Sequence, residues 1–349
     1  MSKRGFDRQP NRSRRHWLQG SLAAIIGGSL VNAQGLGLAE EPAAKPGRVY
    51  ALALHGGAGT EPDKMTAAER QAMEASLGQA LDIGLAILAK HGTGLEAVEQ
   101  VIRHLEDDPQ FNAGRGACFN HVGKHELDAS IMDGKTKACG AVAAVRTVRN
   151  PISLARLVMT KTRHVLLMGD GAEQFADEAQ VERVANEWFS TDLQREKLAR
   201  AKAREAERKE SLEKKMGTVG CVALDVHGNL AAGTSTGGLT NKRWGRIGDS
   251  PIIGAGNYAD NNTCAISCTG TGEEFIRHNV AHEISARVAY RGDTLAAAVD
   301  HLLKQVLKPD DGGLIAVSKS GEIVMDYTTD GMARAAGDSR GKREIKLGR

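Results

Sequence analysis

The stretch 212-LEKKMGTVGCVALDVHGNLAAGTSTGG-238 joins a run of charged residues directly to an apolar segment. From Gln194 to Lys215 acidic and basic residues alternate and no apolar face exists to bury, which predicts a solvated helix or a disordered linker. The apolar run that follows Gly217 and Thr218 is typical of a buried strand. The sequence therefore places a Gly-Thr step between an expendable linker and a core strand.

A threonine in this position can act as a nucleophile if it becomes the first residue of a chain. Its hydroxyl is weakly reactive until a base lies beside it, and a free α-amine supplies that base. The pKa of an α-amine is about 7.7–8.0, so part of it is neutral at working pH. Cleavage between Gly217 and Thr218 would release this amine. The alternative is a linker that merely ends before a strand beginning with threonine.

A second threonine, Thr236, comes close to Thr218 if the two strands form a hairpin. With the turn centred on Gly228, Thr236 lies opposite Gly220 and on the same face as Thr218. A two-residue turn at Gly228 and Asn229 would place Thr236 on the other face.

Two further polar stretches follow. Arg246 and Asp249, three residues apart between glycines, are either a surface ion pair or a site for a zwitterion, with guanidinium for a carboxylate and carboxylate for an ammonium. The run Thr269–Gly272 (TGTG) precedes a predicted helix. Its N–H groups and hydroxyl can stabilise an oxyanion, or a threonine there simply caps the helix.

Composition limits the class of protein. The 349 residues include 41 glycines, 4% aromatic residues and 26% charged residues, which favours a sheet-rich α/β protein with many tight turns. A net charge of +3 is too weak to imply a nucleic-acid partner. The five cysteines are an odd count without a Cys-x-x-Cys motif, so buried structural roles are expected. A pairing of Cys264 with Cys268 stays open.

Residues 1–33 are predicted to be an export signal. Arg14 and Arg15 precede an apolar run of about a dozen residues, too short to span a membrane as a helix, and the block SRRHWL resembles a twin-arginine signal. Val31-Asn32-Ala33 fits a cleavage site, and a signal extending to Ala39 is the second choice. The mature chain is then expected in the periplasm, without a membrane span. An uncleaved basic tail is the alternative.

The order of predicted elements favours a layered α/β sandwich over alternating βαβ units. Strands are predicted at 48–60, 138–148, 164–170, 218–225, 230–238 and 264–272, and a hairpin at 312–328. Two helices are predicted between 66 and 106, and others at 151–162, 273–289 and 294–307. The tail 340–349 does not resemble core. The segment 55-HGGAG-59 lacks the Lys and Ser/Thr of a phosphate loop, and packing under the sheet is expected of it.

Several long motifs together resemble the isoaspartyl peptidase/L-asparaginase family, the plant-type asparaginases of the N-terminal-nucleophile hydrolases. They are HGGAG, FNAGRGA, HELDASIMDG, GTVGCVALD, TSTGGLTNKRWGRIGDSPIIGAG, CTGTGE and TTDGMARA, in family order from about Val49 to Asp338. The resemblance implies a four-layer αββα sandwich and self-cleavage at Gly217–Thr218. It also implies an α subunit of residues 34–217 with its charged linker at 190–217, a β subunit of residues 218–349, and an (αβ)₂ homodimer.

The resemblance also implies the catalytic residues. Thr218 is similar to the nucleophile and Thr236 to the neighbour that hydrogen-bonds it. Thr269 and Gly270 match the oxyanion hole, and Asn112 resembles an active-site asparagine near the nucleophile.

Substrate and ion contacts follow in the same way. Arg246 and Asp249 match the residues that hold the substrate α-carboxylate and α-ammonium, and Gly272 lines the amino-group site together with Gly270. The resemblance implies no catalytic cofactor and one structural sodium ion. Backbone carbonyls of one loop would hold that ion: Leu105, Glu106, Asp108, Phe111, Ala113 and Arg115.

The implied reaction is hydrolysis of the β-amide of L-asparagine and of β-aspartyl dipeptides through a β-aspartyl-threonine ester. Two alternatives stay open. An exported chain invites comparison with glycosylasparaginases, which usually carry Asp before the threonine, whereas Gly217 stands there. The other alternative is a periplasmic protein that binds zwitterions without turnover.

Overall fold

The computed structural model describes residues 49–207 and 217–349. The expected export signal and the linker residues 208–216 lie outside the described residues. The first strand, β1 (Ala51–Ala58), shows how the layers form. Leu52 and Leu54 pack on one side of the sheet, while Ala51 and Ala53 pack on the other. Successive side chains of a strand point to opposite faces, so both faces of this strand are covered.

The described strands form two sheets, and both faces of each sheet are covered. The larger has the order β12-β11-β1-β5-β6-β2-β3-β4, antiparallel except for β3 and β4. Its remaining strands are β2 (Leu127–Asp133), β3 (Cys139–Val145), β4 (Leu166–Met168), β5 (Val219–Leu224), β6 (Leu230–Thr236), β11 (Met332–Asp338) and β12 (Arg343–Lys346). The smaller has the order β10-β9-β8-β7, with β7 (Asn257–Ala259), β8 (Cys264–Gly270), β9 (Gly312–Ser318) and β10 (Ile323–Tyr327).

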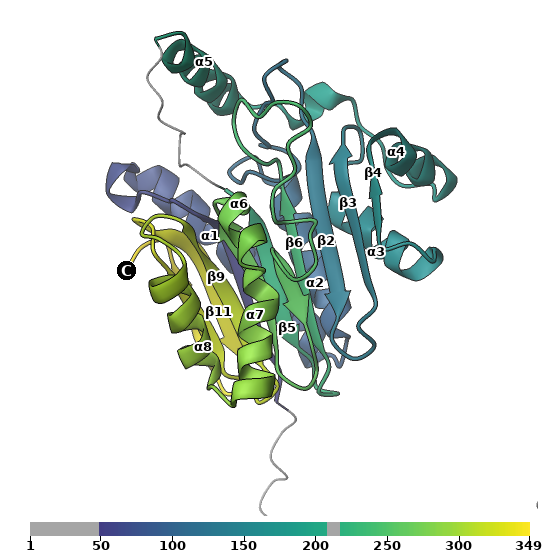
Figure 1. The fold of residues 1–349 in the computed structure, drawn as a ribbon, viewed down its shortest axis with the longest axis vertical. Coiled ribbons are helices and arrows are strands. Elements are labelled where there is room, and N and C mark those ends of the chain that lie inside the picture. The colour runs from purple at the N-terminus through teal and green to yellow at the C-terminus, as the bar shows by residue number, and fades with distance from the viewer. Residues whose placement is uncertain (1–48, 208–216) are drawn as a thin grey trace, which may run out of the picture. The chain divides into compact units, whose positions relative to one another are not determined.

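Helices cover the outer faces of both sheets (Figure 1). On the larger sheet lie α1 (Ala67–Ala89), α2 (Gly94–Asp107) and α3 (Pro151–Lys161). Thr66 and Glu69 form a capping box at the start of α1, and Thr93 caps α2, so both helices begin where the sequence predicts them. On the smaller sheet lie α7 (Val280–Ala286), a π-helical turn (Arg287–Arg291), α8 (Leu295–His301) and a second π-helical turn (Leu302–Val306).

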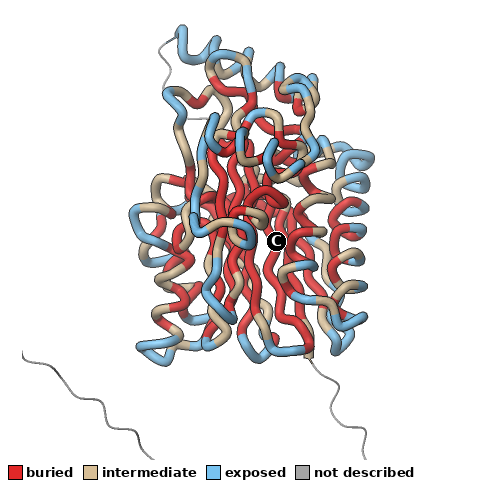
Figure 2. Tube along the Cα trace, turned by 90° about the vertical axis from the view of Figure 1, so that its right-hand side faces the viewer, coloured by how far each residue is buried: buried red, intermediate tan, exposed pale blue. Residues whose placement is uncertain are grey.

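Within the described residues, three apolar cores separate the four layers. One lies between α1–α3 and the larger sheet, one between the two sheets, and one between the smaller sheet and α7–α8. The alternation along β8 shows the division: Ala265 joins the middle core, while Ile266 and Cys268 join the third. Figure 2 shows that the buried residues concentrate in the strands. The predicted αββα sandwich is confirmed.

Several segments differ from their predictions, and the strands β2, β7 and β11 form where none is predicted. The tail 340–349 is not peripheral, because β12 pairs with β11 and Leu347 is buried. A helix, α4 (Gly169–Glu178), follows β4 where none is predicted. Within the charged run, α5 (Asp192–Ala206) is a helix, and its Gln194 is buried and donates to the Gly116 carbonyl oxygen at 2.9 Å. The run is thus docked at one end rather than solvated throughout.

One described helix, α1, is long and apolar enough to cross a membrane by length and composition alone. Its Leu77, Leu81 and Leu88 are fully buried in the core beneath the larger sheet. Packing within the fold accounts for its apolar character.

All five cysteines are free thiols, and four are buried as expected. Cys264 and Cys268 lie four residues apart on β8, a separation of about 13 Å at the usual rise of a strand. A disulfide requires Cα atoms within about 7 Å, so the pairing left open by the sequence does not form.

Candidate active site

The polar residues of the site lie at one end of the strands whose apolar side chains form the core between the two sheets. Val222 and Leu224 of β5 and Ala232 of β6 face the smaller sheet. Further along the same faces come Thr218 and Thr236, both buried. Since the side chains of a strand repeat every two residues, the sheet that forms the apolar core also carries these hydroxyls to its end.

The two threonines are in direct contact, with their Oγ1 atoms 3.1 Å apart. The predicted shared face is confirmed, but the predicted register is wrong by two residues. Val219 pairs with Ser235 and Gly220 with Thr234, so Thr236 lies opposite Thr218 rather than Gly220. The shift is even and therefore leaves the face unchanged.

Asn112 holds the peptide that joins Gly217 to Thr218. Its Nδ2 donates to the carbonyl oxygens of Gly217 at 2.7 Å and Gly238 at 2.8 Å. Its Oδ1 accepts from the Cys118 N–H at 2.8 Å, which fixes the orientation of the amide. Thr236 Oγ1 also donates to the Gly217 oxygen at 3.3 Å. Two donors thus point at one carbonyl, as in an oxyanion hole.

The HGGAG segment lies against the same peptide. A Cβ on Gly57 would lie 2.8 Å from the Gly217 Cα and 3.1 Å from the Thr218 nitrogen. Gly57 also has a φ of +113°, in the region that favours glycine. Gly57 therefore allows β1 to approach the Gly-Thr step closely.

Arg246 and Asp249 both line the cavity at Thr218, but they are not a surface ion pair. Arg246 forms a two-point ion pair with Glu273, at 2.9 and 2.8 Å. Asp249 is 4% exposed, and its Oδ2 has no partner among the described residues. Burial raises the pKa of Asp249 to about 7. A buried carboxylate oxygen without a partner suits a cationic ligand group.

The TGTG run brings the smaller sheet to the site. Gly270 lines the cavity, and the buried Thr269 Oγ1 accepts from the Ala58 N–H at 3.1 Å. Thr271 is the N-cap of the short helix α6 (Gly272–Arg277), but its side chain makes no capping hydrogen bond within the described chain. A Cβ on Gly272 would lie 2.8 Å from Arg246 Nη2 and 3.0 Å from Asp249 Oδ1. Glycine there leaves both groups room.

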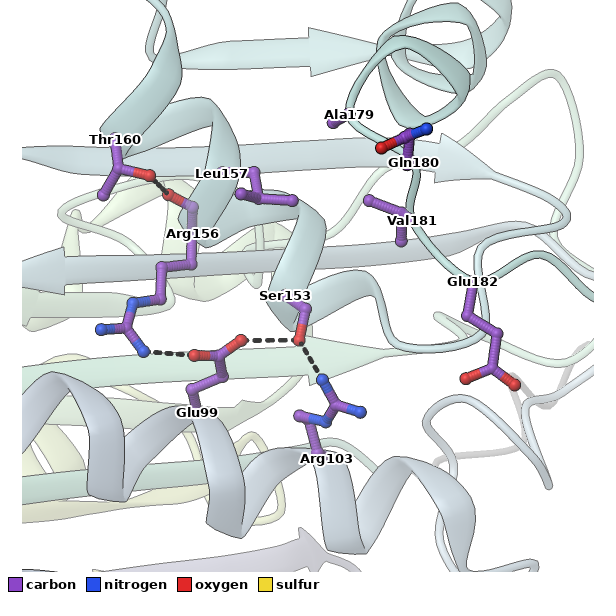
Figure 3. Close-up of a pocket in the computed structure, with 10 residues that line it drawn as sticks. All are labelled: Glu99, Arg103, Ser153, Arg156, Leu157, Thr160, Ala179, Gln180, Val181 and Glu182. Atoms are coloured by element: carbon purple, nitrogen blue, oxygen red, sulfur yellow. Dashed lines mark hydrogen bonds and ion pairs between the residues drawn. The ribbon is translucent and has the colours of Figure 1, made fainter.

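The cavity at Thr218 has a volume of about 10 Å³, room for a single water. Its lining is Gly217, Thr218, Thr236, Gly238, Leu239, Arg246, Gly248, Asp249, Ser250 and Gly270. A much larger cavity of about 400 Å³ lies between α2, α3 and the turn after α4 (Figure 3). It contains none of the predicted site residues, and its Glu99 is already bonded to Arg156 and Ser153. We therefore place the site at Thr218.

The loop expected to hold a sodium ion curls around two glycines. A Cβ on Gly116 would lie 2.5 Å from the Pro109 carbonyl oxygen and 2.6 Å from that of Phe111, and one on Gly114 would clash with that of Glu106. Glycine at both positions therefore allows the loop to fold back closely on its own carbonyl oxygens. No group of three or more His, Cys, Asp or Glu side chains suited to a metal occurs in the described ranges. Neutral carbonyl ligands at this loop fit a hard cation.

Glu106, in the last turn of α2, also reaches β6. Its Oε1 accepts from Ser235 Oγ at 2.6 Å, and the residue is fully buried. Burial raises the pKa of Glu106 to about 8. The side chain thus joins the end of α2 to β6 next to Thr236.

Sequence reasoning missed Glu273 as the partner of Arg246, although Glu273 stands in the quoted CTGTGE motif. It also missed His55, whose ring bonds the Thr218 carbonyl oxygen at 2.9 Å. Glu273 lies 27 positions from Arg246, and His55 lies 163 positions from Thr218. No rule of spacing along the sequence predicts contacts between residues so far apart. The signal that could have indicated Glu273 and His55 is their membership of the CTGTGE and HGGAG motifs.

A four-layer αββα sandwich with a threonine at the head of a central strand is the architecture of the N-terminal-nucleophile hydrolases. The family model described as Asparaginase matches residues 48–347. The isoaspartyl peptidase of Escherichia coli K12 is 45% identical over 295 residues, covering 82% of this chain and 92% of its own. The human isoaspartyl peptidase/L-asparaginase is 43% identical over 287 residues, covering 82% and 92%.

A plant relative, the probable isoaspartyl peptidase/L-asparaginase 2 of Arabidopsis thaliana, is 42% identical over 322 residues, covering 85% of this chain and 98% of its own. The chain belongs to the Asparaginase family and is a hydrolase.

Proposed function

We propose that the protein hydrolyses the β-amide of L-asparagine and of β-aspartyl dipeptides after cutting itself between Gly217 and Thr218. The relatives named isoaspartyl peptidase and L-asparaginase support this activity. The observation that carries it is the position of Thr218. Its hydroxyl contacts Thr236, and the carbonyl before it accepts hydrogen bonds from Asn112 and Thr236.

Maturation begins on this carbonyl. Thr218 Oγ1 attacks the Gly217 carbonyl carbon, and its proton passes to the departing Thr218 nitrogen. Asn112 Nδ2 and Thr236 Oγ1 stabilise the negative charge on the oxygen. Water then hydrolyses the resulting ester, which leaves a carboxylate on Gly217 and a free amine on Thr218. Because Gly217 lines the 10 Å³ cavity, its departure opens room for a substrate.

Substrate hydrolysis uses the same threonine. The α-carboxylate binds Arg246 and the α-ammonium binds Asp249, which leaves the β-carbonyl beside Thr218. The Thr218 amine accepts the proton as the oxygen attacks, and Thr269 and Gly270 stabilise the oxyanion. Ammonia or an amino acid leaves, and water releases aspartate from the ester. Apart from water, this proposed chemistry uses only groups of the chain.

Assembly, ion binding and location complete the proposal. The cut chains form an (αβ)₂ homodimer, and a structural sodium ion binds the loop 105–115, where carbonyl oxygens crowd around Gly114 and Gly116. The protein is exported to the periplasm by residues 1–33. The sodium ion would supply loop rigidity, and the carbonyls of residues such as Glu106 and Phe111 would hold it.

The deciding experiment compares wild type with Thr218→Ala and Thr218→Ser. We expect mass spectrometry to find two wild-type fragments that meet at Gly217 and Thr218, a single intact chain for Thr218→Ala, and slow cutting for Thr218→Ser. An uncut wild type that binds aspartate without turnover would support the zwitterion-binding alternative instead. Faster hydrolysis of glycosylated asparagine than of β-aspartyl dipeptides would support the glycosylasparaginase alternative.

A further inference from the structure

We propose that His55 is a positioning residue for Thr218, and that it acts by holding the Thr218 carbonyl so that the amine and hydroxyl adopt one geometry. This inference rests on the proposed nucleophilic role of Thr218. His55 lies near the end of β1 and is fully buried between the two sheets. Its two ring nitrogens both have partners, and each partner belongs to a different strand or strand end.

The hydrogen bonds fix which ring nitrogen carries the proton. His55 Nδ1 lies 2.9 Å from the Thr218 carbonyl oxygen, which can only accept, so Nδ1 carries the hydrogen. His55 Nε2 is then an acceptor, and Ser267 Oγ donates to it at 3.0 Å. Thr234 Oγ1 lies 2.7 Å from Ser267 Oγ and 3.2 Å from the Gly256 carbonyl oxygen. Burial lowers the pKa of His55 to about 3, which agrees with a neutral ring.

The position of Thr218 explains why a side chain is needed. Strand β5 begins at Val219, and its pairing with β1 ends where Gly220 lies opposite His55. The Thr218 carbonyl therefore lies just beyond the ladder between these two strands, and the ring of His55 replaces the missing backbone partner. Thr236 holds the hydroxyl of Thr218, and His55 holds its carbonyl. Because the hydroxyl and the carbonyl of Thr218 are both held, the α-amine released by cleavage has little freedom to move away from Oγ1.

The surrounding sequence leaves room for this arrangement. A Cβ on Gly220 would collide with both Ser267 Oγ and His55 Nε2, so only glycine fits opposite the ring. Ser267 and Thr269 lie two residues apart and share a face of β8. The chain of hydrogen bonds therefore joins the strand of the nucleophile to the strand of the proposed oxyanion hole across the middle layer.

The test compares His55→Asn with His55→Gln. The Asn side chain places an amide N–H near the position of Nδ1 and can still donate to Thr218, whereas Gln places its amide near Nε2 and reaches Ser267. Both variants lose a ring and are expected to lower the melting temperature by similar amounts. For fully cut protein acting on a β-aspartyl dipeptide, we expect kcat to fall about 100-fold in His55→Gln and about 10-fold or less in His55→Asn. KM should stay within about 3-fold in both, because Arg246 and Asp249 are untouched.

The rate of self-cleavage provides a readout that needs no substrate, and it should follow the same order. Equal rates for the two variants, or a loss confined to KM, would overturn the proposal. If neither variant folds, Ser267→Ala decides, since it removes one of the two hydrogen bonds that hold the ring against the Thr218 carbonyl and should slow both reactions; an unchanged kcat and cleavage rate would then overturn the proposal. Failure of the proposed function is recognised separately, because wild type itself would then neither cut nor hydrolyse.

Discussion

The side-chain amide of Asn112 and the carbonyl of Gly217 are joined by a hydrogen bond of 2.7 Å, across 105 residues of sequence. The same amide group donates to Gly238 and accepts from Cys118, so three backbone segments hold it in place. An amide fixed in this way is ready to stabilise charge on the Gly217 oxygen without reorganising.

Replacement of Asn112 by alanine should therefore slow self-cleavage by about 100- to 1,000-fold, the usual loss for one oxyanion donor. A time course of the intact and cut chains on denaturing gels measures the rate. Gln194→Ala is the matched control, because Gln194 also donates a buried amide N–H to a backbone carbonyl, that of Gly116, away from the cut. Equal cleavage rates in the two variants would contradict a specific role of Asn112.

Gly57→Ala should impair self-cleavage because its new methyl group would press on Gly217 and the Thr218 nitrogen. Gly123→Ala separates this contact from the cost of backbone strain. Gly123 also has a positive φ, 75°, but a Cβ there would meet nothing within 4 Å. Both variants should lose about 1–2 kcal/mol of unfolding free energy from strain. Only Gly57→Ala should also cut slowly, and normal cutting by it would refute the close approach.

Much of the fold could be predicted because the spacing of apolar residues is a local signal. Apolar residues on both faces of β1 and β5 already require covering layers on each side. The hairpin register could not be predicted, because it depends on how Asp225 closes the turn. Asp225 Oδ1 accepts from the His227 and Asn229 N–H groups, both at 2.9 Å, and this centres the turn on His227 rather than Gly228.

The site could be predicted only in part, because the partners of its residues also depend on tertiary structure. Thr218, Thr236 and Gly270 are brought to one cavity, as expected. The partners that hold them are set by tertiary structure: Glu273 of α6 reaches Arg246, and Glu205 of α5 reaches Arg243 at 2.6 Å. Spacing along the chain carries no information about contacts of this kind.

The cysteines give a prediction that tests the strand geometry. Unfolding in denaturant without reductant should expose five titratable thiols, because all five cysteines are free and Cys264 and Cys268 lie too far apart on β8 to pair. Burial raises the pKa of the Cys221 and Cys268 thiols well above its usual value, so the folded protein should react slowly with thiol reagents. A count of three thiols in oxidised protein would contradict the β8 assignment.

Asp249→Ala should separate substrate binding from maturation. The carboxyl group lines the cavity and has an oxygen without a partner, but it makes no hydrogen bond to the Gly217–Thr218 peptide in the described chain. We expect cutting at a rate within about 3-fold of wild type and a loss of kcat/KM of at least about 100-fold, since the substrate ammonium loses its counter-ion. Turnover equal to wild type would remove Asp249 from the ammonium site.

The same carboxyl group should make the stability of the uncut chain depend on pH. Burial raises the pKa of Asp249 from 3.8 to about 7, with Glu273 and Asp128 adding to the rise and Arg246 opposing it. Between pH 3.8 and about 7 the folded chain keeps a proton on Asp249 that the unfolded chain has released. Asp249 therefore lowers the stability of the folded chain as the pH rises through this range. In a Thr218→Ala background, which keeps the chain intact, Asp249→Asn removes the penalty.

The stabilisation of Asp249→Asn relative to its parent should therefore grow from pH 5 to pH 8, by about 2–3 kcal/mol at 1.4 kcal/mol per pKa unit. Urea unfolding at the two pH values measures this difference. Asp63→Asn, at an exposed position outside the site, should show no such growth. A constant difference between Asp249→Asn and its parent would mean that Asp249 is already ionised at pH 5 in the folded chain.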